Sequence, residues 1–145
     1  FEFWSSASDS VYSIKGEVIS TNRPSVNFRV YWDGDLQDEL LDGTRIDKWD
    51  GTRARRLEDF ARFGARSING SKQNPCLSAD ILGDWREEVV FYDGNDPGRL
   101  MIFTTTIPTR VRMPTLMHDR LYRLAVAVQN VAYNQPPHLG RYVGE

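Results

Sequence analysis

The sequence holds few of the residues that form disulfides or nitrogen- and sulfur-ligated metal centres. Cys76 is the single cysteine, which excludes an internal disulfide. The two histidines, His118 and His138, have no nearby histidine or cysteine at the spacing of a zinc motif. No apolar run approaches the roughly 20 residues of a membrane helix. A glycine-rich phosphate loop and a Ser–His–Asp set are also not recognisable, so the sequence favours neither nucleotide binding nor a common hydrolase.

Charge is low as well. A formal net charge of −2 argues against nucleic acids and anionic membranes as partners. Aromatic residues are plentiful at 12%, with four Trp and six Tyr. This suits either the packing of an all-β protein or a carbohydrate-binding surface, and packing is the commoner reason for any single ring.

One pattern occurs twice. Gly34–Leu41 (GDLQDELL) and Gly83–Val90 (GDWREEVV) share the order Gly-Asp-x-x-acid-Glu-apolar-apolar, 49 residues apart. A repeat near this period is typical of propeller blades. The 145 residues supply about three such units, whereas closed propellers have roughly four to eight blades. We therefore expect the ring to be completed by more of the same protein or by a second chain.

The order of polar and apolar residues predicts mostly strands. In Asn27–Trp32 the alternation places Phe28, Val30 and Trp32 on one face. Other segments are predicted as follows: strands at Phe1–Trp4, Val11–Ile14, Arg45–Trp49, Glu88–Tyr92 and Arg99–Thr104; a strand end at Ile81-Leu82; a short helix or excursion at Thr52–Phe63; a helical turn at Leu116–Tyr122; and a last strand at Arg123–Val128.

The Gly-Asp turns bring acidic residues close together. Calcium takes six to eight oxygen ligands, often from loops of this kind. The candidate ligand sets are Asp80, Asp84 and Glu88 in one turn, and Asp33, Asp35 and Glu39 in the other. The alternative is that these side chains cap the turns and pair with Arg86 or a neighbouring unit.

Longer stretches resemble a known family. Tyr31–Gly43, Ile68–Val90, Phe103–Thr109 and Thr115–His138, with GDWREEV and QNVAYNQPPH as the most specific motifs, are similar to the C-terminal part of a rhamnogalacturonan lyase of polysaccharide lyase family 11. The resemblance implies an all-β fold in which residues 1–145 form the C-terminal blades, about three, of an eight-bladed catalytic β-propeller. It also implies that the N-terminal blades and a catalytic arginine lie outside this chain, and that the protein is secreted, periplasmic or on the cell surface.

The implied reaction is calcium-assisted β-elimination at galacturonate in the rhamnogalacturonan I backbone of pectin, with endo and exo action both open. Lys72 and Tyr133 match catalytic positions, although Lys72 taken alone would be solvated and Tyr133 would be packing. The same motifs imply substrate-binding positions at Asn69, Gly70, Ser71, Asn130 and Ala132. They also imply calcium-binding positions at Asn130 and Ala132, in addition to Asp80, Asp84 and Glu88. The alternative function is a non-catalytic, calcium-stabilised propeller or carbohydrate-binding module.

Overall fold

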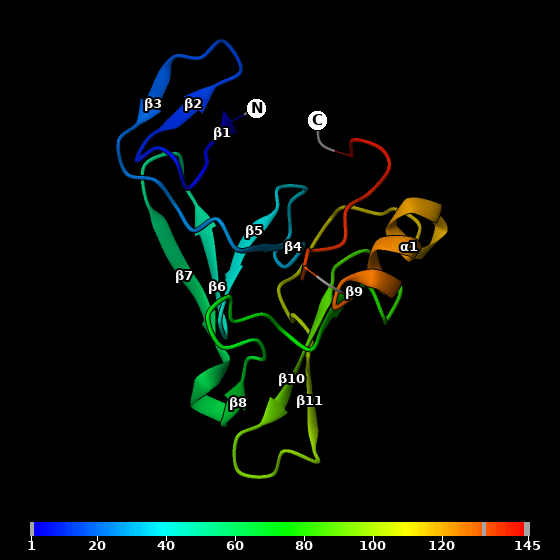
Figure 1. Cartoon of the computed structure of the whole chain (residues 1–145). Helices are drawn as coiled ribbons and strands as arrows, with labels where there is room; N and C mark the ends of the chain where they lie inside the picture. Colours follow the sequence, from blue (N-terminus) through cyan, green and yellow to red (C-terminus); the bar gives the residue numbers. More distant parts are fainter. Residues whose placement is uncertain (1, 132, 144–145) are drawn as a thin grey trace.

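The structure is a computed structural model that describes residues 2–131 and 133–143. Within these residues the chain is built from short antiparallel strands in three sheets, with little helix (Figure 1). The expectation of an all-β chain is confirmed. The helices in the described part are too short and too polar to cross a bilayer.

The first sheet is small and exposed. It consists of β1 (Glu2–Phe3), β2 (Val11–Ser13) and β3 (Val18–Ser20), paired in that order. Phe3 stacks on Tyr12 with ring centroids 5.4 Å apart, which holds the first pair of strands together.

The second sheet is a four-stranded meander of consecutive strands. Its elements are β4 (Phe28–Val30), β5 (Glu39–Asp42), β6 (Arg45–Trp49) and β7 (Ala54–Asp59). Gly43 makes the tight β5–β6 turn with a φ of 61°, a conformation that costs glycine little. Half of the segment Thr52–Phe63 is strand β7, which pairs along β6, and η1 (Phe60–Phe63) is its helical part.

The third sheet is centred on β10 (Glu88–Asp93). On one side β10 pairs with β11 (Leu100–Phe103), and on the other with β8 (Ala65–Arg66) and β9 (Leu77–Ala79). The strand before the second Gly-Asp turn therefore ends at Ala79, and the prediction that Ile81-Leu82 ends it is wrong. The backbone there has already turned, and its N–H groups donate to Glu88 instead of to a neighbouring strand.

The main core lies between the second and third sheets. Phe28, Val30 and Trp32 point into it together, as their alternation predicts. Phe60 packs at its centre, with ring centroids 5.5 Å from Trp32 and 4.4 Å from Phe103. The opposite face of the same strand is also covered, because Tyr31 joins a second cluster with Trp85, Leu116 and Tyr122.

The end of the chain corrects a prediction. Arg123–Val128 is not a strand but part of helix α1 (Arg120–Val128), which follows η2 (Leu116–His118). Asp119 caps the helix by accepting hydrogen bonds from the backbone N–H groups of Leu121 and Tyr122. The segment is a short apolar run after Arg123, a pattern that fits a strand or a helix equally well. The helix forms because Tyr122 and Val126, four residues apart, can then pack on the same cluster.

Candidate functional site

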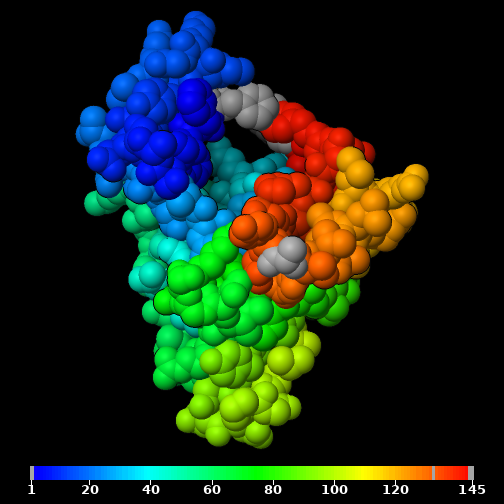
Figure 2. Space-filling model, viewed as in Figure 1, coloured from blue at the N-terminus to red at the C-terminus, as the bar shows by residue number. Residues whose placement is uncertain are grey.

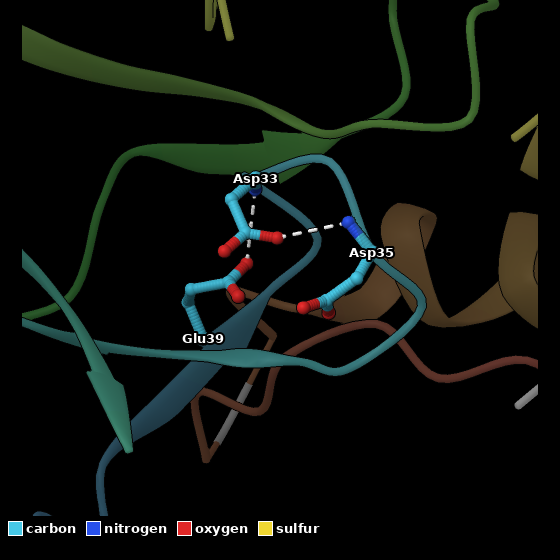
Figure 3. A group of neighbouring side chains, drawn as sticks. All are labelled: Asp33, Asp35 and Glu39. Carbon is cyan, nitrogen blue, oxygen red and sulfur yellow. Dashed lines mark hydrogen bonds between the residues drawn. The ribbon is translucent and has the colours of Figure 1, made fainter. Parts of the chain in front are cut away.

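The first Gly-Asp turn is organised by a buried carboxylate. One oxygen of Glu39, Oε2, accepts hydrogen bonds from the backbone N–H groups of Trp32 (2.8 Å) and Asp33 (3.2 Å). Glu39, Asp33 and Asp35 each bring an oxygen within 4.8 Å of the others (Figure 3), so this group is compatible with a metal ion. The ammonium of Lys48 also contacts all three, at 2.7 Å from Asp33, 2.7 Å from Asp35 and 3.0 Å from Glu39.

Burial controls the protonation of this cluster. Loss of hydration and the nearby Asp33 raise the pKa of Glu39 to about 7, against the opposing effect of Lys48. Burial by itself would lower the pKa of Lys48, but hydrogen bonds to Asp33, Asp35 and Glu39 outweigh it and raise that pKa. The ammonium therefore stays charged at neutral pH.

The second Gly-Asp turn has the same backbone pattern. Glu88 Oε2 accepts from the N–H groups of Ile81 (2.9 Å) and Leu82 (3.0 Å), 49 residues after the corresponding donors of the first turn. Its other oxygen accepts from the hydroxyl of Thr104 at 3.0 Å. The sequence repeat is therefore a structural repeat.

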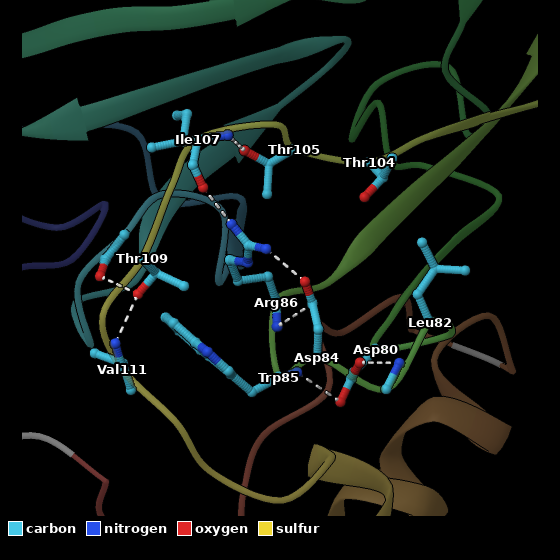
Figure 4. Close-up of polar contacts among 12 residues, drawn as sticks. Asp80, Leu82, Asp84, Trp85, Arg86, Thr104, Thr105, Ile107, Thr109 and Val111 are labelled. Atoms are coloured by element: carbon cyan, nitrogen blue, oxygen red, sulfur yellow. Dashed lines mark hydrogen bonds and ion pairs between the residues drawn. The ribbon is translucent and has the colours of Figure 1, made fainter.

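Asp80 holds the second turn against the C-terminal part of the chain, and Figure 4 shows its position beside Trp85. Its Oδ1 accepts from Gly83 N–H, and its Oδ2 from the N–H groups of Trp85 and Leu116 and the hydroxyl of Thr115, at 2.7 to 3.2 Å. Trp85 sits in the left-handed region at a φ of 73°, an unusual conformation that these bonds maintain.

Asp84 turns away from this position. Its carboxylate pairs with Arg86, whose guanidinium also donates to the carbonyl of Ile107. Asp80, Asp84 and Glu88 thus lie in one turn, but their oxygens are already taken by protein donors. A metal ion at these three residues would have to displace them.

The loop that carries Lys72 is held in a strained shape. Asn69 and Gln73, at its two ends, have positive φ values of 65° and 55°. The side chain of Asn27 at the start of the second sheet donates to the carbonyls of Lys72 and Gln73, and Asn69 bonds to Asn74. Strain of this kind persists only where neighbours enforce it, and it concentrates at functional sites.

The structure brings this loop to the C-terminal tail. The ammonium of Lys72 donates to the carbonyl of Asn134, next to Tyr133 in the chain. Asn130 holds the tail in place, because its side chain donates a hydrogen bond to the carbonyl of Cys76 and accepts one from Asn134. Tyr133 itself is 86% exposed, so its hydroxyl is available to a ligand.

The remaining candidates for substrate binding surround this contact. Asn69, Gly70 and Ser71 are exposed beside the half-buried Lys72. Ala132, expected to bind substrate and calcium, lies outside the described residues. Two separate motifs of the sequence, the loop and the tail, therefore meet on one surface.

A buried ionic network beneath this surface was missed by sequence reasoning. Arg29 donates to Glu87 Oε2 at 2.7 Å and to the carbonyl of Pro137 in the tail. Glu87, which is 0% exposed, also accepts from the N–H of Tyr31 and, at 2.6 Å, from the hydroxyl of Tyr122. Burial raises the pKa of Glu87, although Arg29 and Tyr122 oppose the shift. The signal that could have found it is a charged residue, Arg29, inside an apolar strand.

A separate cleft of about 1110 Å³ lies between the first sheet and the first Gly-Asp turn. Figure 2 shows the corresponding hollow between the N-terminal sheet in blue and the C-terminal segment in red. Trp4, Tyr31 and Trp49 line it, together with Asp35 and Lys48. Neither Lys72 nor Tyr133 lines this cleft, so it is a different surface from the one formed by the loop and the tail.

The described residues form three antiparallel sheets and a surface where the loop and the tail meet, and comparison with known proteins shows which family of domains this arrangement belongs to. The chain matches, over residues 1–145, the family described as rhamnogalacturonan lyase family 11, C-terminal domain. It belongs to this family, and the resemblance found in the sequence is confirmed.

Individual relatives agree. The chain is 51% identical over 145 residues to rhamnogalacturonan endolyase YesW of Bacillus subtilis (strain 168), covering 99% of this chain and 23% of that protein. It is 48% identical over 143 residues to rhamnogalacturonan exolyase YesX of the same strain, covering 92% of this chain and 23% of YesX. It superimposes on the Bacillus licheniformis rhamnogalacturonan lyase PL11 with a TM-score of 0.91 and 53% identity, over 99% of this chain and 24% of that one. The chain thus spans about a quarter of the length of these relatives.

Proposed function

We propose that this chain is part of a rhamnogalacturonan lyase that cleaves the rhamnogalacturonan I backbone of pectin by β-elimination at galacturonate. The observation that carries the proposal is the contact between Lys72 and the carbonyl of Asn134, which joins the strained loop to the tail bearing Tyr133. In this proposal the two segments form one wall of the substrate cleft, and the rest of the protein supplies the other walls.

The reaction removes a proton from C5 of galacturonate and expels the rhamnosyl oxygen from C4. A double bond forms between C4 and C5, and the leaving oxygen gains a proton. Tyr133 is the proposed group that exchanges a proton with the leaving oxygen, a role that its exposure supports, and Lys72 is the candidate base.

Substrate binding is proposed for the groups around this pair. Asn69 and Ser71 offer side chains that hydrogen-bond to sugar hydroxyls, and Gly70 leaves the backbone open to close approach. Asn130, in the tail, is proposed to bind substrate as well, and so is Ala132, which lies outside the described residues.

Calcium is the proposed cofactor. When bound beside the galacturonate carboxylate, it would neutralise charge that builds up as the proton leaves. Asn130 is an exposed residue, and its side-chain oxygen, which accepts a hydrogen bond from Asn134, is of the type calcium prefers, so Asn130 and Ala132 are the proposed ligands in the tail. At Asp80, Asp84 and Glu88 the oxygens already accept hydrogen bonds, so calcium binding there would require these donors to move.

We also propose that the sheets are blades of a β-propeller whose other blades come from the same or a second chain. The four-stranded meander β4–β7 and the repeated Gly-Asp turn support this arrangement. A protein acting on pectin would be secreted, periplasmic or on the cell surface, and this location is part of the proposal.

The test uses the intact protein that carries this sequence. It is incubated with rhamnogalacturonan I in calcium, and the absorbance of the unsaturated uronate product is followed. Product formation that stops with a chelator and resumes with calcium supports the proposal. No product in either condition contradicts it.

Variants separate a catalytic surface from a binding module. Lys72→Met and Tyr133→Phe are compared with Lys15→Met and Tyr12→Phe, which belong to the first sheet and its β2–β3 turn. Loss of turnover in the first pair alone supports roles in the reaction. Full turnover in all four would favour the alternative, in which this chain is a non-catalytic, carbohydrate-binding part.

A further inference from the structure

The acid cluster of the first Gly-Asp turn is fully hydrogen-bonded without any metal. Asp33 Oδ1 accepts from the N–H of Asp35 at 3.0 Å, and Asp35 Oδ1 accepts from the N–H of Gln37 at 2.8 Å. Glu39 Oε2 accepts the two backbone bonds described above. The three oxygens that remain, one from each acid, all accept from Lys48.

Lys48 has one N–H donor for each of these three carboxylate oxygens and lies within hydrogen-bond distance of all of them. An ammonium group has three N–H donors, and all three acceptors lie 2.7 to 3.0 Å from the nitrogen. Its side chain is only 15% exposed, and its backbone is fixed in β6, which is paired on both sides. The ammonium therefore stands where an ion bound by the three carboxylates would stand.

The second turn lacks this arrangement. Lys48 follows Asp47, the strand partner of Leu40, and Thr104 follows Phe103, the strand partner of Val89, so the two occupy corresponding positions. Thr104 gives Glu88 a neutral hydroxyl. The cation of that turn is Arg86, which draws Asp84 away from Glu88. Each turn thus neutralises its acids with a side chain of its own, in a different way.

We propose that Lys48 is a built-in cation that takes the place of a metal ion at the first Gly-Asp turn. When the ammonium is removed, the same three carboxylates become a calcium site. The proposal concerns residues remote from Lys72 and Tyr133, and it stands or falls independently of the lyase reaction.

The physical reason is that the two cations exclude each other. Calcium requires its oxygens at about 2.3–2.6 Å from a common centre. Three oxygens within 4.8 Å of one another are close enough to share an ion, and the ammonium of Lys48 already lies 2.7 to 3.0 Å from an oxygen of each acid. A divalent ion entering there would meet a positive charge at close range and would have to expel the lysine side chain from its strand position.

The first experiment leaves Lys48 in place. The intact protein and its Asp35→Asn and Glu39→Gln variants are stripped with a chelator and dialysed against buffered calcium, and bound calcium is counted by elemental analysis. The proposal expects the same calcium count in all three. A lower count in either variant would show that the triad holds an ion in the natural protein, and would overturn the proposal.

The second experiment removes the ammonium. Lys48→Met keeps the length of the side chain and should raise the calcium count by about one per chain, because three free carboxylate oxygens then face one point. Adding Glu39→Gln to Lys48→Met should abolish the gain. The melting temperature of Lys48→Met should also become calcium-dependent at this turn, beyond the response of the natural protein. No gain of calcium in Lys48→Met contradicts the proposal, and the count in Asp35→Asn still decides it if Lys48→Met does not fold.

Discussion

Replacing Arg29 by methionine breaks the buried network beneath the loop and the tail. Arg29 is 9% exposed and Glu87 is 0% exposed, so the change leaves a carboxylate in the interior without its cation. Removing one partner of a buried ion pair typically costs about 3–5 kcal/mol. Glu87 keeps its hydrogen bonds from Tyr31 and Tyr122, which limits the loss of unfolding free energy. The tail loses its hydrogen bond at Pro137, which adds to that loss.

The measurement is the free energy of urea-induced unfolding, compared between the intact Arg29→Met variant and the unmutated protein. Arg53→Met is the matched control, because Arg53 is a 76% exposed side chain whose pair with Asp50 lies at the surface. Surface pairs contribute less than about 1 kcal/mol. The double variant Arg29→Met/Glu87→Gln should recover part of the stability lost in Arg29→Met, since the unpaired charge is gone. If Arg29→Met destabilises the protein no more than Arg53→Met, the claim that the Arg29–Glu87 network stabilises the fold is refuted.

Four other substitutions test the site and the fold. Lys72→Ala and Tyr133→Phe should each lower kcat by about 10²–10⁴-fold with smaller changes in KM, as followed by formation of the unsaturated product. A rise in KM with unchanged kcat would instead assign these residues to binding. Burial raises the pKa of Glu39 to about 7, so the folded state binds this proton more tightly, and stability should fall as the pH rises from about 4.5 to about 7. Unfolding at several pH values should show that Glu39→Gln flattens this slope, and an unchanged slope would refute it. Gly34→Ala should lower the melting temperature by several degrees, roughly the effect of 1–3 kcal/mol of overpacking, because a Cβ there would lie 2.7 Å from the carbonyl oxygen of Pro108.

The repeat was the most reliable guide to the fold. Glu39 and Glu88 occupy the same place in the pattern, and each folds back onto the backbone N–H groups that open its turn. A carboxylate seven residues after the first donor can close such a turn locally, so its position in the sequence carries the information. The strand containing Phe28 and Val30 was equally readable, because alternation decides which side chains face the core.

The segment Arg123–Val128 shows where the pattern is insufficient. It is a short apolar run that fits a strand or a helix, and the helix is chosen by packing on a cluster that includes Trp85, which is distant in sequence. Asp119 as a helix cap was visible in the sequence, but it could equally have been a turn residue. For a short apolar segment, tertiary packing outweighs local periodicity.

The candidate site divides in the same way. Its residue types and the lyase family were evident from motifs such as QNVAYNQPPH, because a motif is a contiguous run of residues that can be read directly in the sequence. That Lys72 reaches Asn134, that Arg29 is buried against Glu87, and that Lys48 fills the acid triad depend on chain segments brought together from far apart. By itself the sequence determined the repeat, most of the strands and the family. Only the tertiary structure decided which charges neutralise one another, because the energy of a charge depends on its burial and its neighbours in space.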